Sequence, residues 1–381
     1  MKNSKILFIR YFILPLLVLF LFTASCSDDD NDDPQTTPTT KLLDTSGLDL
    51  YIKNAEKLQA GTEPSEAEWN AYFDTPFLKG FMETRGFNDE QKQELKQGLK
   101  ITMRTAYQNL PPGNLTPGLQ GMYEHNLRYK TKLNELKEYS TQLNNGNMRQ
   151  VIANIIAPFL PARLQNEDLI PPALYAFHIL GAEATGTPDA LEMDAMLSYT
   201  IDSYPLTRGY AAAHEAYHSV TLAALEKRRI PIPAGDPRNE VLSTLKLISQ
   251  EGIADLIDKD LTLRPDSPVY SYWLFMIENE QQNAISFINN LNTIAEGLSR
   301  GEVINLPTNL YGGHQPGRYM GRMIRETGGF RDLIVDPENP FAFLYIYNTA
   351  ARRLGSSDYP VFSDTAINFL RQLESQLIRP L

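Results

Sequence analysis

The stretch AAAHEAYHSV, residues 211–220, places His214 and His218 four positions apart, with Glu215 directly after the first histidine. Alanine is the best helix former, so the stretch favours a helix. On a helix, residues at i and i+4 lie on one face, and both imidazoles can therefore point at one metal ion. The spacing predicts a helix over about 206–229 that presents two metal ligands.

Zinc is the ion that this pattern favours. A catalytic zinc ion takes three protein ligands and keeps one position for water, whose pKa falls toward about 7. A carboxylate beside that water can accept its proton as the water attacks a carbonyl carbon. We expect Zn²⁺ at His214 and His218, with Glu215 as the general base. The motif is short, and a buried helix without metal is the alternative.

A second helix supplies a third ligand. Asp236 is a good N-cap, and Pro237 suits the first position of a helix. That helix carries EGIAD, in which Glu251 and Asp255 are four residues apart and share one face. One carboxylate can bind zinc while the other accepts the remaining N–H of a ligand histidine and fixes its tautomer. We expect Glu251 as the ligand and Asp255 as that partner.

Other ligand sets compete with this one. The metzincin pattern continues with a glycine and a third histidine at fixed offsets, but those positions hold Thr221 and Ala224, which excludes that class. Asp258 and Glu240 are competing third ligands. Glu251 is preferred because Asp255, four positions after it, can accept the remaining N–H of a ligand histidine.

The two motifs together carry a resemblance. His-Glu-x-x-His followed by Glu-x-x-x-Asp resembles the gluzincins, the thermolysin-like peptidases that bind zinc through two histidines and a glutamate. EGIAD is similar to zinc-dependent peptidases found as bacterial lipoproteins. The resemblance covers about residues 170–350. It implies an α+β, predominantly α, zincin-like fold with a small sheet beside the active-site helix, and hydrolysis of peptide or protein substrates by a zinc-bound water.

Two further segments fit that resemblance. PALYAFHILGAEATG, residues 172–186, suits a buried strand, and in zincins such an edge strand can pair with an extended substrate. A glycine-rich loop then leads into a helix and offers donors for the oxyanion of the reaction, in the order His314, Tyr319 and Tyr311. Related families often have tyrosine where His314 stands, and a turn with a solvent-facing histidine is the alternative.

The N-terminus has the pattern of a secretory signal over residues 1–25, with basic residues, an apolar run and the small residues TASC. TASC resembles the lipobox of bacterial lipoproteins, which implies a lipid on Cys26. An uncleaved anchor is the alternative, although the uncharged span of 11–27 is short for a membrane helix. Cys26 is the only cysteine, so the chain has no internal disulfide.

The rest of the chain divides into three parts. Residues 26–45 are acidic and then rich in Thr and Pro, which is typical of a disordered tether and resembles the tail of surface-exposed lipoproteins in gram-negative bacteria. We expect a helical region over 46–165 and a catalytic region over 166–381. Together these features predict a protein of the cell envelope, lipid-anchored in the outer membrane and exposed on the surface.

The charge balance argues against nucleic acid as a partner. The chain has 35 Lys and Arg against 46 Asp and Glu, a net charge of −11, and no basic patch. His125 and His178 lack a partner pattern and are expected to be structural. Nothing in the sequence indicates an oligomeric state. Two other functions stay open: a surface lipoprotein that captures peptides or glycans without cleaving them, and a zinc hydrolase acting on a non-peptide amide.

Overall fold

The computed structural model describes residues 43–381 apart from 86–87, 105–122, 124–125, 177–183, 205, 234, 268, 271–273, 275–276, 301–312 and 356–358. Cys26, His125, His178 and Tyr311 lie outside the described residues. None of the helices in this described part combines the length and apolar character needed to span a bilayer.

The two helices predicted to carry the metal ligands are present. Helix α9 spans Tyr210–Arg228 and helix α10 spans Pro237–Thr262. The Asp236 side chain caps α10 by accepting the backbone N–H of Arg238 at 2.9 Å, as predicted. Every residue of α9 from Ala211 to Thr221 is buried, so the motif helix runs through the interior of the molecule.

Glycines bring α10 against helix α13, which spans His314–Glu326. A Cβ atom on Gly252 would lie 2.6 Å from the carbonyl oxygen of Gly317, too close for any real contact, and Gly317 and Gly321 face the α10 backbone in the same way. The two backbones can touch only because these positions lack side chains. The crossing lies next to Glu251 and therefore brings the start of α13 toward it.

A small mixed sheet lies beside α9. Its order is β1-β2-β4-β3, in which β1 (Leu43–Asp44), β2 (Ala173–Ala176) and β4 (Leu191–Asp194) are parallel. Strand β3 (Ala184–Gly186) is an antiparallel edge strand on β4. The segment 172–186 was expected to be a single buried strand at the sheet edge, and that expectation of one strand is wrong: it contributes the mostly buried inner strand β2 and the edge strand β3. Gly186 packs directly on the carbonyl of Glu215.

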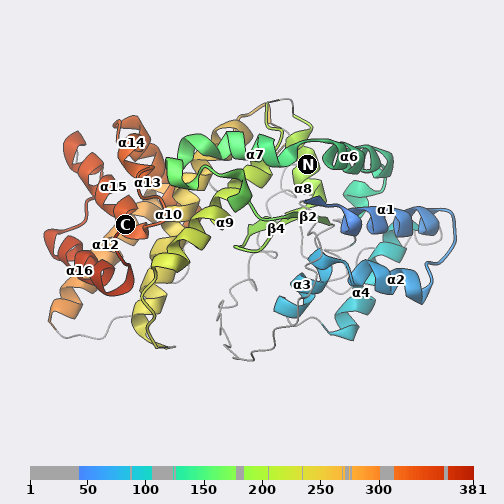
Figure 1. Cartoon of the computed structure of the whole chain (residues 1–381), viewed down its shortest axis with the longest axis horizontal. Coiled ribbons are helices and arrows are strands. Elements are labelled where there is room, and N and C mark those ends of the chain that lie inside the picture. The colour runs from blue at the N-terminus through green and yellow to red at the C-terminus, as the bar shows by residue number, and fades with distance from the viewer. Residues whose placement is uncertain are drawn as a thin grey trace, which may run out of the picture.

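The remaining helices flank this centre, and a single hydrophobic core connects them from Leu48 to Ile378. Figure 1 shows the N-terminal helices on one side of the sheet and the C-terminal helices at the opposite end, with α9 and α10 between them. Five aromatic side chains in the N-terminal region are all buried: Trp69, Tyr72, Phe73, Phe77 and Phe81. The bounds of the other α-helices are α1 Ser46–Gln59, α2 Glu66–Phe73, α3 Pro76–Arg85, α4 Asp89–Met103, α6 Leu133–Asn145, α7 Met148–Ile156, α8 Ala195–Asp202, α12 Glu280–Ser299, α14 Phe330–Leu333, α15 Pro340–Leu354 and α16 Asp364–Leu377.

The architecture is mostly helical with one small sheet, as expected. The division at residue 165 stays a prediction. Leu43 and Asp44, at the end of the expected tether, belong to the sheet as β1.

Candidate metal centre

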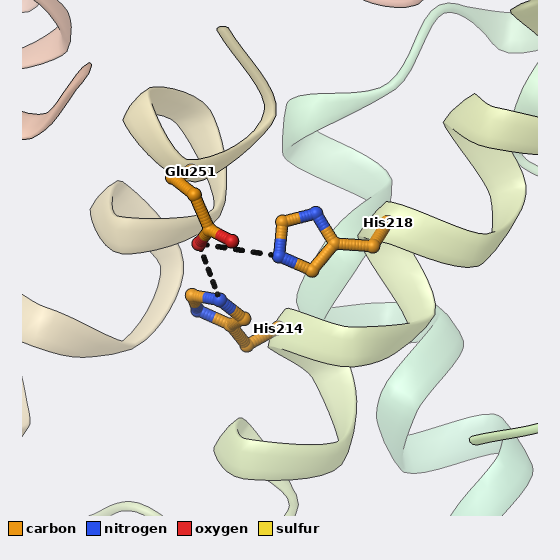
Figure 2. Close-up of side chains that lie close together, drawn as sticks. All are labelled: His214, His218 and Glu251. Atoms are coloured by element: carbon orange, nitrogen blue, oxygen red, sulfur yellow. Dashed lines mark hydrogen bonds and ion pairs between the residues drawn. The ribbon is translucent and has the colours of Figure 1, made fainter. Parts of the chain in front are cut away.

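Three side chains from α9 and α10 meet at one point. Figure 2 shows His214 and His218 on α9 directed at the carboxylate of Glu251 on α10. The Nε2 atoms of His214 and His218 lie 3.2 Å and 3.3 Å from Oε2 of Glu251. Both histidines are buried, and the Glu251 side chain is nearly so. The i, i+4 spacing on α9 thus places both imidazoles as the sequence predicts.

The spacing of these atoms suits a zinc ion. Ligand atoms at about 2.0–2.2 Å from a tetrahedral zinc ion lie about 3.3–3.6 Å apart. The two nitrogen-to-oxygen distances are close to such an edge, and two imidazoles with one carboxylate are a common donor set for catalytic zinc. His214, His218 and Glu251 are therefore the residues that would hold the ion. Glu240, the competing ligand, is exposed in the first turn of α10.

The Asp258 carboxylate contacts the ring nitrogen of His214 that faces away from Glu251. The sequence had suggested a different role for Asp258. The Nδ1 atom of His214 lies 3.0 Å from Oδ1 of Asp258, so an Nδ1–H donates to Asp258 and leaves the Nε2 lone pair for the metal. The sequence prediction gave this position to Asp255 and weighed Asp258 as a ligand. Asp258 lies seven residues after Glu251 on the same face of α10, and the crossing of α9 and α10 brings it, and not Asp255, against Nδ1 of His214.

Asp255 instead orients His314. The Nδ1 atom of His314 lies 3.1 Å and 3.2 Å from the two carboxylate oxygens of Asp255, and 3.1 Å from Oε2 of Glu251. The Asp255 side chain is 0% exposed, whereas that of His314 is 27% exposed. His314 is thus the part of the cluster most open to solvent, and its ring is anchored on the inner side.

Lys259 joins the two buried aspartates, and sequence reasoning missed it. Its Nζ donates to Oδ2 of Asp258 at 2.6 Å and lies 3.8 Å from Oδ1 of Asp255. The side chain is buried, although lysine is among the residue types least often found inside proteins. Lys259 lies four residues after Asp255, and this spacing in the sequence could have indicated that the two side chains pair.

These contacts shift the ionisation of the buried groups. Burial alone would lower the pKa of His214, but the carboxylates of Asp258 and Glu251 raise that pKa well above its usual value. Burial alone would raise the pKa of Glu251, yet His314, His218 and His214 lower that pKa well below its usual range. For Asp258, Lys259 and His214 outweigh burial and lower the pKa to about 2.

The other two predicted catalytic residues have different surroundings. Glu215 follows His214 on α9 and is 9% exposed, and its carbonyl accepts the hydroxyl of Ser219. Tyr319 is buried on α13, where its proximity adds to the effect of burial in raising the pKa of Tyr347 on α15. His314 is the residue that α13 contributes to the cluster.

Comparison with known protein families is consistent with a zinc site at this position. The model of a family described as "Putative zinc dependent peptidase (DUF5700)" matches residues 69–356, more than half of the chain. The chain belongs to this family. The match spans both the predicted helical region and the predicted catalytic region. A search of curated proteins and a search of solved structures each gave no match.

Proposed function

We propose that the chain is a zinc-dependent peptidase of gluzincin type, with zinc held by His214, His218 and Glu251. The observation that carries the proposal is the convergence of these three donors from two helices, with Asp258 behind His214. A divalent zinc ion bound there supplies Lewis-acid chemistry: it polarises a carbonyl and lowers the pKa of water.

The protein's own groups account for the proton transfers. Glu215 accepts the proton of the attacking water and later delivers it to the leaving amine. His314, with Nδ1 held by Asp255 and Glu251, has its Nε2 left to donate to the oxyanion that develops on the scissile carbonyl. Burial lowers the pKa of His314, but Glu251 and Asp255 outweigh this and raise it, which favours the protonated donor.

The edge strand gives a place for the substrate backbone. Strand β3 lies at the edge of the sheet and packs on the residue proposed as the base, through Gly186 and Glu215. An extended peptide added to that edge would place its carbonyl groups near the motif helix. We infer that peptides bind in this way.

Glu215→Gln is the test of the peptidase. The variant removes the base while keeping the size of the side chain, so we expect zinc content to be unchanged and cleavage of a peptide library to fall by about 100-fold or more. Glu226→Gln is the matched control, since Glu226 lies on the same helix and is 48% exposed. Undiminished cleavage in Glu215→Gln would remove this residue from the mechanism. Peptide binding without any cleavage by the zinc-loaded wild type would favour the capturing lipoprotein instead.

We also propose that a lipid on Cys26 anchors the protein in the outer membrane at the cell surface. The lipobox-like TASC and the acidic tether support this. Metabolic labelling with a fatty-acid probe should mark the wild type and spare Cys26→Ala. Equal labelling of both would contradict the lipid anchor.

A further inference from the structure

The metal centre contains more potential ligands than one ion needs. Among the described residues, three overlapping groups have donor atoms close enough to hold an ion: His214 with His218 and Glu251, His214 with Asp255 and Asp258, and Glu251 with Asp255 and His314. The last two groups share Asp255. A second ion there could bridge to the first through Glu251, as carboxylates do in two-metal sites.

Lys259 stands at the place where those two additional groups overlap. Its ammonium contacts Asp258 at 2.6 Å and lies 3.8 Å from Asp255, and both carboxylates are buried. An ammonium is a compact point charge with three donors and cannot ligate a metal while it is protonated. Asp255 and Asp258 thus already share one cation, the ammonium of Lys259.

The charge of the centre agrees with a single metal ion. The α10 face carries three carboxylates, from Glu251, Asp255 and Asp258, and one ammonium, which leaves a net charge of two minus. One divalent cation balances this charge of the α10 face. A second divalent ion would lie within a few ångströms of both the first ion and the ammonium, where repulsion in a buried site is strong.

We propose that Lys259 takes the place of a second metal ion and restricts this centre to one. The inference rests on the metal centre of the proposed function but not on peptide cleavage. A buried lysine that only stabilised the fold would have no effect on how many ions bind. The number of ions per chain therefore separates the two roles.

The experiment counts zinc in the wild type and in Lys259→Met. Each protein is saturated with excess Zn²⁺, freed of unbound metal by gel filtration and measured by mass spectrometry of the metal against protein concentration. We expect about one zinc per chain in the wild type and about two in Lys259→Met, because Asp255 and Asp258 lose their cation. Lys259→Arg keeps the charge and should bind about one. The double variant Lys259→Met/Asp255→Asn should also return to about one.

Several results would overturn the proposal. Two tightly bound zinc ions in the wild type would show that the Lys259 ammonium does not exclude a second ion. One zinc ion in a folded Lys259→Met would show that removing the ammonium does not create a second site. Circular dichroism establishes folding. If Lys259→Met folds only in the presence of metal, its melting temperature should keep rising as the second equivalent of zinc is added, while that of the wild type levels off after the first; parallel curves would refute the idea. Absence of zinc from every variant would instead contradict the metal centre itself.

Discussion

Oδ1 of Asp258 lies 3.0 Å from Nδ1 of His214, on the far side of the ring from the Nε2 that faces Glu251. This hydrogen bond fixes both the tautomer and the orientation of a histidine that we propose as a metal ligand. Three of the groups that build the centre come from one face of α10. The proposed metal site therefore includes a carboxylate, that of Asp258, which positions a ligand without being a ligand itself.

Asp258→Asn tests that dependence. The amide can still accept a hydrogen bond but lacks the charge that raises the basicity of His214, so we expect zinc affinity to fall by about 10–100-fold. Competition with a chromogenic chelator measures the affinity. Asp260→Asn is the control, because Asp260 lies on the same helix, is 42% exposed and pairs with Arg325. Equal affinity in Asp258→Asn and the wild type would show that the hydrogen bond has no effect on the ligand.

Gly252→Ala tests the helix crossing. The new methyl group would meet the Gly317 carbonyl and the Phe343 ring, each at 2.6 Å, so α10 and α13 would have to separate. We expect the free energy of unfolding to fall by about 1–3 kcal/mol. In Gly80→Ala the methyl group meets only Glu192 at 3.9 Å, and the gain in helix propensity should leave stability unchanged or raise it by up to about 1 kcal/mol. Denaturant unfolding compares the two, and equal stabilities would mean that the crossing tolerates a side chain.

His314→Gln separates catalysis from metal binding. Loss of an oxyanion donor typically lowers kcat by about 100–1,000-fold, and zinc should stay bound because its three proposed ligands are intact. Asp255→Asn should give a smaller loss, since Asp255 holds the His314 ring without being proposed to touch the substrate, and Glu251 also contacts that ring nitrogen. Metal analysis and peptide kinetics on the same samples provide the measurement. Loss of zinc together with activity would assign His314 to the metal and not to the oxyanion.

Zinc binding should strengthen as the pH rises. Carboxylates raise the pKa of His214 well above its usual value, so at low pH zinc must displace a proton from this ligand. The same raised pKa stabilises the metal-free protein below about pH 6.5, and that contribution is lost as the pH rises through the folded-state pKa. We therefore expect the increase in melting temperature on adding zinc to be larger at about pH 8 than at about pH 6. An increase that is independent of pH would contradict the coupling.

Much of this site follows from sequence because helical spacing is rigid. His214, His218 and Glu251 lie at positions that two short motifs specify, and once both helices form, only their crossing is left to determine. The position of His314 depends on a different crossing, that of α10 with α13, where Gly252 and Gly317 approach closely, and no local sequence pattern gives such a tertiary contact. This is why the sequence could place His314 near the reaction but could not place its ring against Asp255.

The predictions that were wrong, and the residue that was missed, also depend on tertiary contacts that the sequence does not show. Asp255 and Asp258 are both within two turns of Glu251, and which of them reaches His214 depends on the angle between α9 and α10. The stretch 172–186 is rich in apolar and small residues over most of its length, so its composition could not show where one strand ends and the next begins. Lys259 was missed because a lysine in a helix is usually solvated, and only its surroundings show that it is buried.

The central claim is a zinc ion held by α9 and α10, and metal stoichiometry on residues 41–381 tests it most directly. We expect about one zinc per chain in the wild type, greatly reduced in Glu251→Ala and unchanged in Glu240→Ala, the exposed glutamate of the same helix. Absence of zinc from the wild type after attempted reconstitution would contradict the claim, and full retention in Glu251→Ala would show that the third ligand lies elsewhere.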